Sequence, residues 1–189
     1  LHQWPFRRLP QDQIDLLLEK MRQHGITQAW AASFDGILHR DIASVNRRLT
    51  KECARTDGRL VPFGSVNLTL PHWEEDLRRC HEIHRMPGVR LHPNYHGYSL
   101  ADPRFNRLLE QASERSLLVQ IPVLMEDTRT QHPMMAVRDV DPAPLLELLP
   151  AMPKARVMLL NSGKVADGPL FERLAQLTGV YFDTARVES

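Results

Sequence analysis

Arg90 and His92 stand two positions apart in an apolar segment, so a β-strand here would present both side chains on one face. A guanidinium can bind a carboxylate through two parallel N–H···O bonds, and an imidazole can exchange protons near neutral pH. The pair could therefore hold a carboxylate-bearing substrate, with His92 as a catalytic acid or base. A hydrogen-bonded histidine at the end of a strand explains His92 equally well.

Other polar residues also follow apolar segments. His96 lies in a Tyr-His-Gly-Tyr segment, where it could shape a pocket or stand exposed in a loop. Glu126, Asp127 and His132 occupy a long segment and could act as acid and base groups, whereas a solvated loop with ion pairs to Arg129 is the structural alternative. We take His92, Asp127 and His132 as catalytic candidates. The candidates for substrate binding are Trp4, Phe6, Arg90, Asn94, Tyr95, His96, Glu126 and Asn161.

The elements that must position these residues alternate between helix and strand. Helical periodicity with start and stop signals predicts helices over residues 11–24, 41–55, 103–115, 142–149 and 169–177, and a further helix begins at Pro71. Short apolar runs predict strands over 27–32, 60–66, 88–91, 117–123, 156–160 and 180–182. Successive strands begin roughly 30 residues apart, which is the spacing of βα units in a parallel sheet.

Six strands of this kind fit an incomplete (β/α) barrel or a doubly wound open sheet. The dinucleotide fingerprint Gly-x-Gly-x-x-Gly and the Walker-type Gly-Lys-Ser/Thr are both absent from the sequence, so the pattern favours the barrel without deciding between the two. In either fold the functional residues are expected at the carboxyl ends of the strands.

Composition limits the classes of partner. Of the 189 residues, 42% are hydrophobic and 25% are charged, and a net charge of +1 gives no reason to expect nucleic acid or an acidic membrane surface. No apolar run is long enough to span a bilayer, and Cys53 and Cys80 do not suggest a disulfide framework. We expect a cytoplasmic protein of one domain that binds a small molecule and can form homo-oligomers.

Several segments resemble the amidohydrolase-related (amidohydrolase 2) family. They are Trp-Pro-Phe-Arg at 4–7, Ser-Phe-Asp-Gly at 33–36, Gly-Val-Arg-Leu-His-Pro at 88–93, Asp-Pro-Arg-Phe at 102–105 and Tyr-Phe-Asp at 181–183. The family includes metal-dependent hydrolases and decarboxylases, such as aminocarboxymuconate-semialdehyde decarboxylase. The resemblance implies one barrel domain over residues 1–189, an incomplete (β/α)8 TIM-like α/β fold with strands two to seven present and both ends truncated.

The resemblance also implies where a metal would bind. A His-x-His motif would precede Leu1 and a metal-binding aspartate would follow Ser189, so zinc or another divalent ion would belong to the longer protein. Pro122 stands where the family usually has its strand-five histidine, and Asn161 stands in the strand-six position. A proline side chain cannot bind metal and an asparagine is a weak zinc ligand, so no metal site can be assigned within this chain.

Two functions remain open. The first is an amidohydrolase-like hydrolase, or a non-oxidative decarboxylase, that acts on a small carboxylate-bearing or cyclic substrate with or without a metal ion. The second is a divergent family member without metal, which binds a small molecule or is non-catalytic. A His-x-His motif upstream and a carboxylate on an eighth strand would favour the first.

Overall fold

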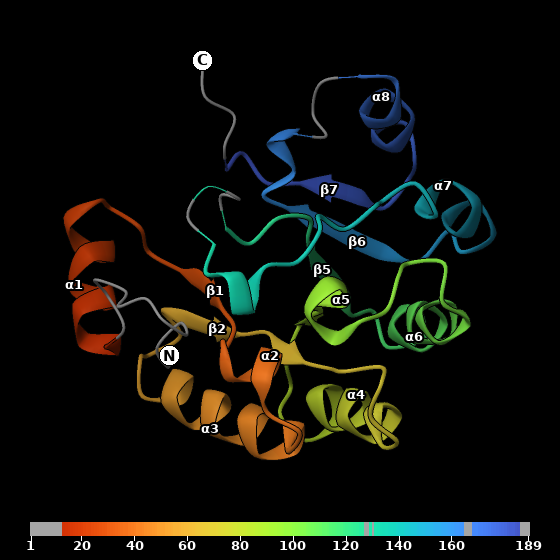
Figure 1. Cartoon of the computed structure of the whole chain (residues 1–189). Helices are drawn as coiled ribbons and strands as arrows, with labels where there is room; N and C mark the ends of the chain where they lie inside the picture. Colours follow the sequence, from red (N-terminus) through yellow and green to blue (C-terminus); the bar gives the residue numbers. More distant parts are fainter. Residues whose placement is uncertain (1–12, 127–128, 130, 165–167, 186–189) are drawn as a thin grey trace.

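The computed structural model describes residues 13–126, 129, 131–164 and 168–185. The strands are short, and helices alternate with most of them along the chain and lie outside them in space (Figure 1). The strands are β1 (Ala29–Ala31), β2 (Leu60–Pro62), β3 (Gly64–Ser65), β4 (Gly88–Arg90), β5 (Leu118–Pro122), β6 (Arg156–Leu160) and β7 (Val180–Phe182). The α-helices are α1 (Ile14–Gln23), α2 (Asp35–Leu38), α3 (Ile42–Ala54), α4 (Trp73–Glu82), α5 (Pro93–His96), α6 (Pro103–Glu114), α7 (Leu145–Leu148) and α8 (Pro169–Ala175), with 3-10 turns η1 (Pro133–Met135), η2 (Leu149–Ala151) and η3 (Ser162–Lys164).

The order of the strands decides between the two predicted architectures. β1 pairs with β2, and β3 to β7 form one sheet in chain order, with every pairing parallel. A doubly wound sheet would need a switch point at which the strand order reverses, and these pairings show none. The helices α3, α4, α6, α7 and α8 follow one another around the outside of the strands (Figure 1). The described strands therefore form part of a (β/α) barrel.

The strand predicted over residues 60–66 is interrupted at Phe63, which separates β2 from β3. Pro62 still pairs with Ala31 in the ladder of β1 and β2. The N–H of Phe63 donates to the Ala31 carbonyl at 2.7 Å, and after this residue the chain changes its pairing partner from β1 to β4. The buried Asn46 side chain of α3 holds β3, because its amide donates to the Ser65 carbonyl and accepts from the Ser65 N–H.

The helix predictions are largely confirmed, with two additions. Asp41 caps α3 by accepting the Ser44 N–H at 3.0 Å, and Asp102 caps α6 by accepting the Arg104 N–H at 2.9 Å. The predicted helix over 142–149 is only one α-helical turn, continued by η2. The short helices α2 and α5 were not predicted, since four residues carry too little periodicity. None of the described helices is long and apolar enough to cross a membrane.

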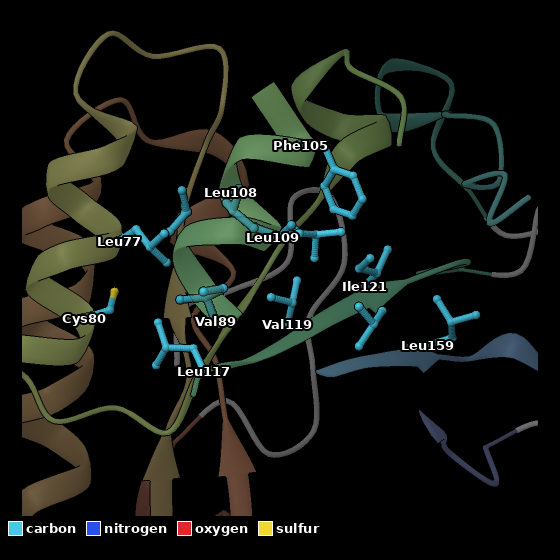
Figure 2. Close-up of a cluster of buried hydrophobic side chains, with 14 of the residues drawn as sticks. Leu77, Cys80, Val89, Phe105, Leu108, Leu109, Leu117, Val119, Ile121 and Leu159 are labelled. Carbon is cyan, nitrogen blue, oxygen red and sulfur yellow. The ribbon is translucent and has the colours of Figure 1, made fainter. Parts of the chain in front are cut away.

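The hydrophobic core lies between the outer face of the strands and the helices. Figure 2 shows Val89, Val119 and Leu159 of three neighbouring strands beneath Leu108 and Leu109 of α6. All five side chains are no more than 1% exposed. Because side chains alternate along a strand, the residues between them must face the inside of the barrel.

Replacing Leu108 with alanine should destabilise the fold by about 2–5 kcal/mol, because the lost side chain leaves a cavity at the centre of this core. Urea unfolding would measure the change. The matched control is Leu16→Ala on α1, where a side chain 49% exposed should change the free energy of unfolding by less than about 0.5 kcal/mol. Equal losses in the two variants would contradict the described packing.

Candidate active site

A single row of side chains crosses the inner face of the sheet. The strand register aligns Ser65 with Arg90, Arg90 with Gln120, Gln120 with Met158, and Met158 with Tyr181. The neighbouring positions on the same strands face the helices and are apolar. The polar residues of the strands that face the inside of the barrel therefore lie side by side in this inner row.

Arg90 is held in this row by one hydrogen bond. Its Nε donates to Gln120 Oε1 at 2.9 Å, and the Gln120 side chain is only 1% exposed. Gln120 Nε2 lies 4.0 Å from Met158 Sδ, a weak acceptor. Within the described residues, the two terminal nitrogens of Arg90 have no hydrogen-bond partner. The guanidinium is thus fixed by its Nε edge, and no bond from the described residues engages its outer edge.

The charge of Arg90 is poorly compensated. Burial lowers the pKa of Arg90 to about 10, and the carboxylate of Asp183 partly opposes that shift. The Asp183 oxygens accept the Asn161 N–H at 2.9 and 3.0 Å, and no ion pair joins Arg90 to a carboxylate of the described chain. Arg90 stays protonated at neutral pH, so it brings a positive charge to this part of the barrel.

His92 follows Arg90 by two residues and immediately precedes α5. The residue is 2% exposed, and neither ring nitrogen has a hydrogen-bond partner among the described residues. Burial lowers the pKa of His92 to about 3, with smaller contributions in the same direction from His96 and Arg90. The imidazole is therefore neutral near pH 7, with one N–H to donate and one nitrogen to accept.

The helix α5 fixes the residues that follow β4. Pro93 begins the helix, and Gly97 ends it with a left-handed φ of +73° that favours glycine. His96 Nε2 donates to the Gly36 carbonyl at 3.0 Å, which joins α5 to α2. The rings of His92 and His96 meet edge to face with centroids 6.1 Å apart. His96 therefore helps to shape the surroundings of His92.

The segment after β5 packs against α5. Asn94 donates to the Arg138 carbonyl at 3.0 Å. Burial raises the pKa of Tyr95 to about 12, and the charge of Glu126 adds to this shift, which places Tyr95 near Glu126. Asn161 donates its side-chain amide to the Leu124 carbonyl at 2.8 Å. Two of the predicted binding residues, Asn94 and Asn161, thus hold backbone positions around the strand ends.

The remaining predicted residues are more dispersed. His132 is exposed, and its Nδ1 accepts the Met134 N–H at 3.3 Å at the start of η1. Trp4, Phe6 and Asp127 lie outside the described residues. Sequence reasoning did not select Gln120. A polar residue inside the apolar run 117–123 was a weak local signal, and its alignment with Arg90 comes only from the pairing of β4 with β5.

The described residues do not fit a bound metal ion. Pro122 ends β5 without a donor atom, and the Asn161 amide is already used on Leu124. No group of three histidine, cysteine, aspartate or glutamate side chains in the described ranges could hold an ion. The described residues therefore do not supply the ligands for the metal that the family resemblance implies.

Below neutral pH, His92 should destabilise the fold. The pKa of His92 in the folded protein is about 3 and that of an unfolded histidine is about 6.5, so the unfolded chain takes up the proton first as the pH falls. This contribution to stability is complete above about pH 6.5 and is lost toward pH 3, at up to about 1.4 kcal/mol per pH unit. The free energies of unfolding of the protein and of His92→Gln can be compared between pH 5 and 8. As the pH falls, the protein should lose stability relative to His92→Gln, because only the histidine takes up a proton on unfolding. A difference independent of pH would contradict the neutral, buried ring.

Comparison with known proteins gives a consistent result. A family model described as amidohydrolase matches residues 4–187. A comparison with curated protein sequences finds no match. Among solved structures, 5-carboxyvanillate decarboxylase from Sphingomonas paucimobilis superposes with a TM-score of 0.69 at 13% identity, over 91% of this chain and 64% of that protein.

Two further structures are similar. One is 2,6-dihydroxybenzoate decarboxylase in complex with 2,6-dihydroxybenzoate, with a TM-score of 0.60, 17% identity, and coverage of 82% of this chain and 57% of that one. The other is 5-carboxyvanillate decarboxylase from Novosphingobium aromaticivorans in complex with manganese and 4-hydroxy-3-methoxy-5-nitrobenzoic acid, with a TM-score of 0.65, 16% identity, and coverage of 87% and 57%.

The chain spans about 57–64% of the length of these three structures. At such low identity they support the fold, which is a TIM-type barrel in agreement with the sequential parallel strands. The family match extends over nearly the whole sequence and agrees with the segments around residues 88–105 and 181–183. The chain belongs to the amidohydrolase family.

Proposed function

We propose that the protein is an enzyme that removes carbon dioxide, without oxidation, from a small carboxylate-bearing cyclic molecule. The observation that carries this proposal is the Arg90 guanidinium, which is fixed inside the barrel, positively charged and without a carboxylate partner in the described chain. A substrate carboxylate would complete the hydrogen bonds of its two terminal nitrogens and neutralise its charge.

The similar solved structures support the choice of reaction. The three structures compared are decarboxylases, and two of them hold a substituted benzoate. Benzoates are flat, cyclic and anionic, which suits a guanidinium that is fixed along one edge. Hydrolysis of a cyclic ester or amide is the other reaction expected of this family.

His92 is the side chain best placed to assist Arg90. It shares the inner face of β4 and its extension, and its neutral ring can donate one hydrogen bond and accept another. In the proposed reaction Arg90 orients the anion, and His92 bonds a polar group of the substrate beside it. Asp127 and His132 stay predictions as acid or base groups of the segment after β5, and Trp4 and Phe6 stay predictions for substrate contact.

A second candidate function is favoured by Pro122 and Asn161. Two positions that would supply metal ligands in the family here hold a residue without a donor and an amide engaged with the Leu124 carbonyl. A barrel with these substitutions could bind a small carboxylate without transforming it. The two functions share the Arg90 site and differ in whether carbon dioxide is released.

Arg90→Met should lower kcat/KM for carbon dioxide release from a benzoate substrate by about 10- to 100-fold, since charge-assisted hydrogen bonds contribute about 1.5–3 kcal/mol. Substituted hydroxybenzoates, assayed with the natural protein for carbon dioxide, are suitable substrates. The matched control is Arg173→Met on α8, where the arginine is exposed and kcat/KM should not change. Equal activity of Arg90→Met and the natural protein would refute the proposed role.

The same assay separates the candidates. Carboxylate binding without carbon dioxide release would support the binding protein, and turnover of lactones alone would support a hydrolase. Activity that is lost with a chelator and restored by manganese would place the metal on ligands beyond the residues described above. Unchanged activity in the chelator would support chemistry by side chains alone.

A further inference from the structure

We infer that Gln120 determines the specificity of the site for anions, by positioning Arg90 through a neutral acceptor that leaves its positive charge to the ligand. This inference rests on the carboxylate site of the proposed function, and it adds a residue that neither the sequence motifs nor the family resemblance selects. It concerns recognition of the ligand and not the bond that is broken.

The geometry divides the guanidinium into two edges. Gln120 Oε1 accepts from Nε at 2.9 Å, and the terminal nitrogens make no hydrogen bond to the described chain. A carboxylate that binds an arginine through two bonds needs an edge with two N–H groups pointing the same way. The Gln120 bond holds the plane of the guanidinium and leaves such an edge for a ligand.

The choice of a neutral acceptor is unusual for an arginine in the interior. Buried charges are generally paired, because removing an ion from water is costly without a partner. The acceptor beside Arg90 is an amide, and the nearby carboxylate of Asp183 is engaged by the Asn161 N–H through both oxygens. Asp183 lies near enough to act on the charge of Arg90 but does not bond its terminal nitrogens, so a ligand carboxylate is the partner expected there.

Gln120 is itself held rigidly. Its strand, β5, pairs on both sides with β4 and β6, and the side chain is 1% exposed. The amide nitrogen faces the Met158 sulfur at 4.0 Å, so the oxygen is the end turned to Arg90. A glutamate in this place would have the same shape, accept the same bond and cancel the charge.

Gln120→Glu is the decisive variant, tested in the full natural protein with benzoate as the ligand and benzamide as its neutral analogue. Benzoate binding, measured by calorimetry, should weaken at least about 10-fold, because the carboxylate introduced by the substitution neutralises Arg90 and repels the ligand. Benzamide binding should stay the same or improve, and the melting temperature should not fall. In turnover, KM should rise more than kcat falls.

The control Gln28→Glu adds the same charge on an exposed side chain and should leave benzoate binding unchanged. Gln120→Met, which keeps volume but removes the acceptor, tests positioning alone and should weaken benzoate binding by a smaller factor than Gln120→Glu. If Gln120→Glu does not fold, Gln120→Met still tests the inference, since unchanged benzoate binding in that variant would refute it.

A merely structural role for Gln120 predicts the opposite outcome, because an ion pair between Arg90 and the introduced carboxylate would hold the site as well or better. Benzoate binding at full strength in Gln120→Glu would therefore overturn the inference, as would failure of the natural protein to bind benzoate. Loss of benzoate binding in Gln120→Glu, in a protein that releases no carbon dioxide, would support the inference and refute the proposed reaction. If the protein releases carbon dioxide and Gln120→Glu leaves KM unchanged, the proposed reaction would stand and the inference about Gln120 would be refuted.

Discussion

The alternation of side chains along β4, β5 and β6 constrains every other part of this structure. One set of positions, including Val89, Val119 and Leu159, must be apolar because the outer helices cover it. The intervening set contains Arg90 and Gln120, which meet inside the barrel because the strands run parallel and in register. A shift of one residue in a strand would exchange the two sets, placing a guanidinium under α6 and leaving valines in the site.

Polar side chains join the segments at the strand ends by donating hydrogen bonds to backbone carbonyls. His96 connects α5 to the Gly36 carbonyl, Asn94 connects α5 to the segment after β5, and Asn161 connects the end of β6 to that same segment. These bonds hold the segments that surround Arg90 and His92 at fixed positions, so an asparagine at a strand end can serve architecture as readily as chemistry.

Sequence reasoning predicted the parts of the fold that depend on local pattern. The strands over 156–160 and 180–182 agree with β6 and β7, because apolar runs between clear turn signals have few alternatives. The interruption at Phe63 marks the change of pairing partner from β1 to β4, which no local pattern reports. The choice between barrel and open sheet also required strand pairing, since both architectures share the same succession of βα units.

The candidate site was predictable in its location and less so in its composition. Arg90 and His92 were identified because their spacing alone puts them on one strand face. Gln120 was missed because its importance comes from a partner 30 positions away, and a glutamine within a strand has no chemistry of its own to attract notice. The use of Asn161 on the Leu124 carbonyl could likewise be seen only when β6 and the segment after β5 were placed together.

The two faces of the strands also separate the contacts that keep the barrel folded from the positions proposed to meet a ligand. Substitutions at inner positions such as Gln120 and Met158 change charge and shape inside the barrel without touching the contacts beneath α6. A library of variants restricted to this inner row would therefore explore new ligands on an intact scaffold. The same separation gives such a barrel room to change its chemistry while the outer packing continues to supply its stability.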